Sequence, residues 1–131
     1  MPDARPDRVY GILVRDGRVF VRETGRGPGL PGGAFRPLAD NRKTEIRAHL
    51  YDQLGVIAER IWAQGAFDYQ DAAEDAPAFS GFYTVWDWSG EIAADAGRWL
   101  GRDEIPSVAG LPGSLRILLL SVLDTVAIKT R

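Results

Sequence analysis

Cysteine is absent from this chain of 131 residues, and histidine and methionine occur only once each. Without cysteine the protein can form neither a disulfide nor a metal site with thiolate ligands. The missing thiols fit a reducing compartment, so we expect a cytoplasmic protein.

Strong net charge and long apolar runs are also missing. The formal net charge is -2 and basic residues form no cluster, which argues against binding to a nucleic-acid duplex. The longest apolar run, Ile117 to Leu120, is far too short to span a bilayer. The first residues, MPDARPDR, contain no apolar segment, so we expect no signal peptide and no membrane partner.

The length suits one compact domain that spans residues 1–131. Residues 1–7 carry two prolines and alternating charges, and we expect them to fray. Val9 to Arg15 and Arg18 to Glu23 are rich in strand-forming residues. The Asp16-Gly17 pair between them predicts a β-hairpin.

The next segments predict a loop and then a helix. Residues 25–33, GRGPGLPGG, hold five glycines and two prolines, which predicts a loop without regular structure. Asp40 or Asn41 is expected to cap the helix, and Gly55 is expected to end it. The helix carries an apolar stripe at four-residue spacing, formed by Ile46, Leu50 and Leu54.

The second half of the chain alternates strands with loops and ends in a helix. Ser114 is expected to cap this helix. Residues 70–76 form an acidic loop and residues 89–97 a second loop. Strands are predicted over Val56 to Ala63, Ala66 to Tyr69 with Gly65 as a bulge, Ala78 to Trp88, and Arg98 to Leu100. The order of elements predicts a layered α/β domain.

Residues 30–56, LPGGAFRPLADNRKTEIRAHLYDQLGV, place the glycine loop directly before the helix. The stretch resembles the Nudix box of the Nudix hydrolases, written G-x5-E-x7-R-E-U-x-E-E-x-G-U with U an aliphatic residue. Gly32-Gly33, Leu50 and Gly55-Val56 match its opening glycines, its inner aliphatic residue and its closing pair. The resemblance implies a Nudix-type α/β/α sandwich with a mixed β-sheet, and it implies that Gly32 and Gly33 bind substrate.

Most charged positions of the box hold other residues in this chain. Counting back from Gly55, Ala48 falls on the arginine and His49 on the glutamate after it, while Asp52 and Gln53 fall on the paired glutamates. In active members of the family these carboxylates bind Mg²⁺ or Mn²⁺, which activates water to attack a diphosphate. The resemblance therefore gives Asp52, His49 and Gln53 as the catalytic positions, although glutamine is a poor Mg²⁺ ligand.

A residual metal site would use carboxylates, because Mg²⁺ prefers oxygen ligands. Asp52 keeps a carboxylate on the helix, and Glu45 lies one turn before His49. Asp40 falls on the first glutamate of the box if one residue is inserted after Gly33. A solvated helix face is the alternative for Asp52 with Glu45. For His49 the alternative is a solvated or hydrogen-bonded side chain.

Two further segments leave alternatives open. The acidic residues of the 70–76 loop would supply a metal ligand or general base, or would only form a soluble hairpin tip. The aromatic side chains of the strand over Ala78 to Trp88 alternate between its two faces. Half of them are expected in the core, and the others would cover an interface or stack on a nucleobase.

Two hypotheses for function follow. The first is a divergent Nudix hydrolase that acts on a nucleoside diphosphate linked to another group, with weak or lost metal-dependent hydrolysis. The alternative is a non-catalytic Nudix-fold module that binds a nucleotide-like ligand or a protein partner. A homodimer is compatible with the resemblance, because members of the family often dimerise.

Overall fold

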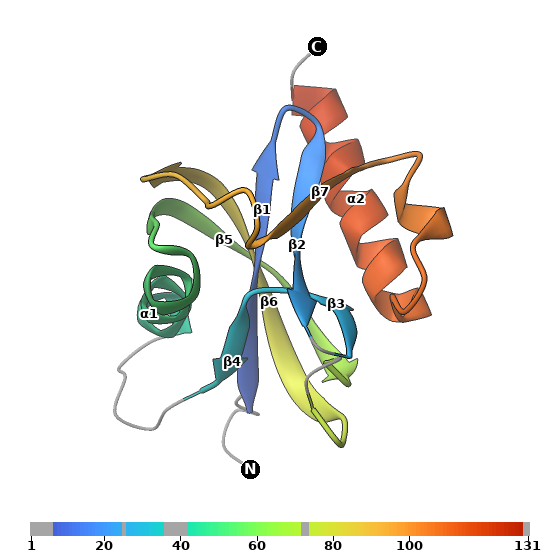
Figure 1. Cartoon of the computed structure of the whole chain (residues 1–131), viewed down its shortest axis with the longest axis horizontal. Coiled ribbons are helices and arrows are strands. Elements are labelled where there is room, and N and C mark those ends of the chain that lie inside the picture. The colour runs from blue at the N-terminus through green and yellow to red at the C-terminus, as the bar shows by residue number, and fades with distance from the viewer. Residues whose placement is uncertain (1–6, 25, 36–41, 72–73, 130–131) are drawn as a thin grey trace.

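The computed structural model describes residues 7–24, 26–35, 42–71 and 74–129. None of the helices in these ranges is long and apolar enough to cross a membrane. Figure 1 shows a central sheet with one long helix on each side. The elements in chain order are β1 (Arg8–Arg15), β2 (Arg18–Thr24), β3 (Gly27–Gly29), β4 (Gly32–Ala34), α1 (Arg42–Leu54), β5 (Ile57–Tyr69), β6 (Ala78–Ser89), β7 (Gly97–Gly101), the 3-10 helix η1 (Ile105–Ser107) and α2 (Gly113–Lys129).

Strand β1 is the centre of the sheet, whose order is β3-β2-β1-β6-β5, with β4 paired to β1 and β7 paired to β2. Residues Arg8 to Leu13 of β1 run parallel to Ser80–Val85 of β6. The end of β1 instead pairs antiparallel with β2. The sheet is therefore mixed, and with helices on both faces it forms the predicted α/β/α sandwich.

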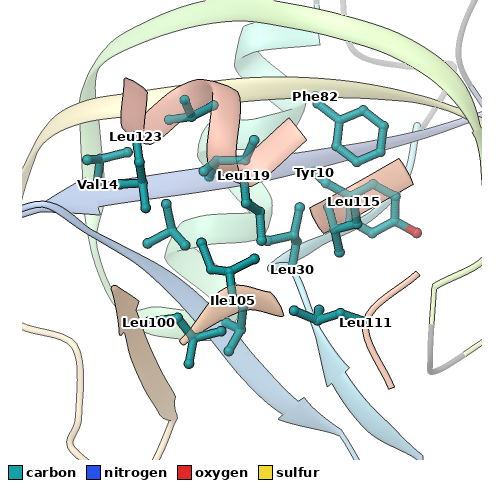
Figure 2. Close-up of a cluster of buried hydrophobic side chains, with 14 of the residues drawn as sticks. Tyr10, Val14, Leu30, Phe82, Leu100, Ile105, Leu111, Leu115, Leu119 and Leu123 are labelled. Atoms are coloured by element: carbon teal, nitrogen blue, oxygen red, sulfur yellow. The ribbon is translucent and has the colours of Figure 1, made fainter. Parts of the chain in front are cut away.

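Side chains of β1 alternate between two hydrophobic cores, as the period of a strand requires. Val9 and Leu13 pack on the α1 side, in a cluster with Ile46 and Leu50. The other cluster lies on the α2 side, where Figure 2 shows Leu115, Leu119 and Leu123 near Tyr10 and Val14. Because both faces are covered, β1 reads as an almost continuous apolar run.

The side chains of β6 also alternate between the two hydrophobic clusters. Phe82 belongs to the α2-side cluster and Tyr83 to the α1-side cluster, and both are buried. Trp86 and Trp88, near the end of the strand, are only partly buried. Phe82 and Tyr83 are therefore core residues on opposite faces of the strand, while the two tryptophans lie at the edge of the core.

The hairpin and the first helix confirm the predictions from sequence. Asp16 and Gly17 have φ values of 54° and 73°, as the tight turn between β1 and β2 needs. Gly55 has φ of 71°, and its N–H donates to the Tyr51 carbonyl at 2.9 Å, which ends α1. The three residues of the apolar stripe are buried. The expected caps, Asp40 and Asn41, lie outside the described residues.

The prediction that residues 25–33 form only a loop is wrong. Strand β3 pairs with β2, and β4 pairs with β1. The glycines make this possible rather than prevent it. A Cβ on Gly32, whose φ is 146°, would lie 2.1 Å from the Val9 carbonyl oxygen, so only glycine lets β4 approach β1 so closely.

Two smaller features of the second half can also be compared with expectation. The two strands predicted around Gly65 form one strand, β5, whose register against β6 shifts between Ala63 and Gly65. This shift confirms a bulge at that point. The prediction that Ser114 caps the last helix is wrong, because α2 begins at Gly113 and the Arg116 N–H donates to the Pro112 carbonyl.

Replacing Leu50 should test the packing of α1 against the sheet. Leu50 is fully buried, so Leu50→Ala should lower the free energy of unfolding by about 2–5 kcal/mol through lost burial and a cavity. The neighbouring Tyr51 is 61% exposed, and Tyr51→Ala should change it by no more than about 0.5 kcal/mol. Urea unfolding of both variants measures this, and an equal loss in the two would mean that α1 packs with another face.

Candidate functional site

The side chain of Gln53, on the last turn of α1, is bonded to the backbone of Gly32 in β4. Its Oε1 accepts the Gly32 N–H at 2.9 Å, and its Nε2 donates to the Gly32 carbonyl at 2.8 Å. Arg22 of β2 also donates to Oε1, at 2.9 Å. The amide thus pairs with Gly32 as a neighbouring strand would, and satisfies both backbone groups. Gln53 therefore positions the glycine pair of the box.

His49, one turn earlier on α1, lies against the second glycine of the pair. Its Nε2 is 2.9 Å from the Ala34 carbonyl oxygen, so this nitrogen carries the proton that is donated. A Cβ on Gly33 would come within 3.1 Å of the ring, so a larger residue there would require the ring to shift. The His49 side chain is only 15% exposed. The hydrogen-bonded alternative for His49 is the one that the structure contains.

Glu45 lies one turn before His49 on α1 and faces the imidazole ring of His49. One of its carboxylate oxygens is 3.8 Å from His49 Nε2 in an i, i+4 pair. The side chain is 3% exposed, so the alternative of a solvated face does not hold for Glu45. Sequence reasoning missed this burial because it arises from tertiary packing and not from the local sequence.

Of the candidate metal ligands, Glu45 and Asp52 lie in the described part of the chain, and they differ in burial. Asp52 is exposed, Glu45 is buried beside His49, and Asp40 lies outside the described residues. Within the described ranges, no three His, Asp or Glu side chains are placed to hold a metal ion. The oxygen of Gln53 already accepts two hydrogen bonds and carries no charge. These residues do not fit the three-carboxylate metal centre that the resemblance implies, and their roles as ligands stay predictions.

A cleft of about 510 Å³ opens at another place, between the end of β5 and the start of α2. Sequence reasoning did not predict it, because its walls come from segments far apart in the chain. The lining residues are mostly polar or charged: Arg26, Asp68, Tyr69, Gln70, Asp71, Glu74, Pro112 and Ser114.

Asp71 is the most enclosed carboxylate of this cleft. One of the two alternatives for the 70–76 loop was a soluble hairpin tip, but Asp71 is only 9% exposed. A Cβ on Gly29 would lie 2.7 Å from Asp71 Oδ1, so the glycine of β3 makes room for the carboxylate. A buried, negatively charged group at a cleft is unusual and indicates a functional role.

Two tyrosines stand beside Asp71. The rings of Tyr10 and Tyr69 meet edge to face, with centroids 5.3 Å apart. Burial raises the pKa of both phenols above the usual value, and the negative charge of Asp71 raises each pKa further. Both hydroxyls therefore stay protonated at neutral pH and can act as hydrogen-bond donors.

Comparison with known proteins identifies the fold. No family model matches the sequence, and no curated protein matches it either. Solved structures do match. A MutT NUDIX hydrolase from Burkholderia pseudomallei is 25% identical, with a TM-score of 0.66, and the match covers 86% of this chain and 93% of that chain.

Two other solved structures match over most of their length. A MutT protein from Bacillus halodurans is 14% identical with a TM-score of 0.72, and 91% of this chain and 82% of that chain are covered. The NUDIX domain of Shewanella oneidensis NrtR, crystallised with ADP ribose, is 14% identical with a TM-score of 0.63, with 98% and 90% covered. These matches confirm the resemblance seen in the sequence. The chain therefore has the fold of the Nudix hydrolases.

Removing the Gln53 amide should loosen the glycine strand. Gln53→Ala should lower the free energy of unfolding by about 1–2 kcal/mol, because the Gly32 N–H and carbonyl both lose their partner. The matched control is Gln70→Ala. This glutamine is exposed and makes one bond to the Glu74 carbonyl, so its loss should cost no more than about 0.5 kcal/mol.

Urea unfolding compares the two glutamine variants, and hydrogen exchange at the Gly32 amide reports the same bond directly. The exchange rate of this amide should rise in Gln53→Ala and stay unchanged in Gln70→Ala. Equal exchange in both variants would contradict the role given to Gln53.

Proposed function

We propose that this protein is a divergent Nudix hydrolase that binds a nucleoside diphosphate linked to another group and hydrolyses it weakly or not at all. The observation that carries the proposal is the pair of hydrogen bonds between the Gln53 side chain and the Gly32 backbone. At a position where the box has a metal-binding glutamate, this chain has a neutral amide whose two ends are bonded to the Gly32 backbone.

The other box positions support the same conclusion. Water activation by a divalent metal needs several oxygen ligands, usually carboxylates, around one ion. Ala48 cannot orient a carboxylate as the box arginine does through its forked hydrogen bonds. His49 donates to a backbone carbonyl. What remains near the helix is Asp52, which is exposed, and Glu45, which is buried.

Such a protein can bind a ligand without hydrolysing it efficiently, because the scaffold around the glycine pair is intact. A ligand related to nucleotides is supported by the NUDIX domain of NrtR, which was crystallised with ADP ribose. It is also supported by the cleft beside β5, whose volume of about 510 Å³ is typical of small-molecule sites.

A protein partner is the second candidate. Strand β5 lies at the edge of the sheet, and two of its apolar side chains are exposed, Ile57 at 57% and Trp62 at 47%. An edge strand with exposed apolar residues offers backbone groups and surface for pairing with another chain, including a second copy.

A combined screen separates these functions. The protein is mixed with nucleoside diphosphate derivatives and Mg²⁺ or Mn²⁺, and phosphate release and melting temperature are measured together. We expect a rise in melting temperature without significant release, since a ligand that binds the folded state stabilises it. Turnover of about 1 s⁻¹ or faster would contradict the loss of catalysis. A chain that responds to no compound would favour the protein partner.

Any residual hydrolysis should depend on Asp52. Asp52→Asn keeps the shape of the side chain and removes its charge, so release should fall at least tenfold, or roughly 1.4 kcal/mol of transition-state stabilisation. Asp95→Asn, in an exposed turn far along the chain, serves as the control and should leave the rate unchanged. If Asp52→Asn were as active as the control, the metal would be held elsewhere.

A further inference from the structure

The tip of the β1–β2 hairpin carries two arginines that face each other. Arg15 and Arg18 are direct partners across the antiparallel pair of strands, and both side chains are exposed. Like charges directly opposite each other on a sheet destabilise the pairing of the strands. An anion bound between the two guanidinium groups would remove this repulsion.

These two arginines differ from the other arginines of the chain. Every other arginine whose side chain is described makes an ion pair or a hydrogen bond, as Arg98 does with Glu23 at 2.8 Å. Arg15 and Arg18 make neither kind of contact with the described residues. Since a guanidinium group has five N–H donors, both side chains can bind an acceptor from outside the chain.

Aromatic side chains hold Arg15 in place. Its guanidinium carbon lies 4.2 Å from the centre of the Trp88 ring, which is a cation–π contact. Trp88 in turn stacks on Trp99, with ring centroids 6.0 Å apart and planes 15° apart, and Phe20 meets Trp99 edge to face. Because the tryptophans already fix its position, Arg15 loses less side-chain freedom when a ligand binds.

A hollow of about 290 Å³ lies beside the two arginines. Its lining residues are Arg15, Asp16, Arg18 and Trp99. The lining carries two positive charges against one negative charge, so it favours an anion. Glu104 is another acid near Arg18, but its carboxylate accepts the Gly101 N–H at 3.0 Å and does not line the hollow.

This hollow is separate from the other two sites. The glycine pair of the box lies beside Val9 and Tyr10, and Arg15 comes five residues after Tyr10, roughly 17 Å further along β1 at the rise of a strand. Figure 1 shows the hairpin tip and β4 at opposite ends of the sheet. The hollow also shares no lining residue with the cleft between β5 and α2. A ligand at the hairpin tip would therefore be bound apart from the box.

We propose that the hairpin tip is a second binding site, which takes a phosphate group between Arg15 and Arg18. A phosphate group carries about two negative charges and three acceptor oxygens, so it can accept bonds from two guanidinium groups at once. A carboxylate carries one charge, and a single arginine satisfies both of its oxygens. The partly buried ring of Trp99 adds a flat apolar wall, against which an organic group attached to the phosphate would pack. The inference goes beyond the proposed function and uses none of its residues.

Nuclear magnetic resonance of the full chain tests the inference with three probes: inorganic phosphate, phenyl phosphate and acetate, at about pH 8, where the phosphates are doubly charged. We expect both phosphates to shift the Gly17 amide and the Trp99 indole N–H. Tighter binding of phenyl phosphate would identify an organic phosphate as the ligand, and equal binding would identify the free ion. Acetate that binds as tightly as the phosphates would overturn the inference. Shifts confined to the Gly32 and Gly33 amides, or no shifts, would also overturn it and would leave the proposed function standing.

Variants assign the binding to the two arginines. Arg15→Gln and Arg18→Gln should each weaken the binding of phenyl phosphate at least about tenfold, because each removes charge-assisted hydrogen bonds. The matched control is Arg98→Gln, which changes an exposed arginine that is already paired with Glu23 and should alter the affinity by no more than about twofold. All three side chains are exposed, so the variants should fold. An affinity that stayed unchanged in both Arg15→Gln and Arg18→Gln would overturn the inference.

Discussion

The hydrogen bonds between Gln53 and Gly32 join the three parts on which the rest of the structure depends. Gln53 belongs to α1, Gly32 to β4, and β4 pairs directly with the central strand β1. The same contact fixes the glycine pair, on which the His49 ring packs. A family scaffold is thus retained, while the residue that completes it is an amide rather than a carboxylate. At this position of the box, Gln53 supports the glycine strand and supplies no negative charge.

Local features of the fold could be predicted from sequence because their causes are local. The Asp16-Gly17 turn needs only the conformational freedom of two residues, and the stripe of α1 needs only the period of a helix. The pairing of β3 and β4 could not be predicted in this way. It depends on how closely two backbones approach, and the glycines that permit the approach at Val9 also look like loop residues in the sequence.

The candidate site also combines features that could be predicted from sequence with features that could not. The box frame gave the positions of His49 and Gln53, but not that both side chains bond to the backbone of the glycine strand. Glu45 and Asp71 are charged residues in polar stretches, where exposure is the usual outcome. The burial of Glu45 arises from tertiary packing, and that of Asp71 needs the room left at Gly29, so neither leaves a pattern in the local sequence.

Binding of Mn²⁺ to the protein without nucleotide, followed by the electron paramagnetic resonance of the free ion, tests the proposed loss of the metal centre most directly. With Gln53 bonded to Gly32 and Glu45 buried, few carboxylates of α1 are left for an ion. The expected result is a dissociation constant on the order of millimolar, or no binding at all. A micromolar site would contradict the proposed loss of the metal centre and would support an active hydrolase.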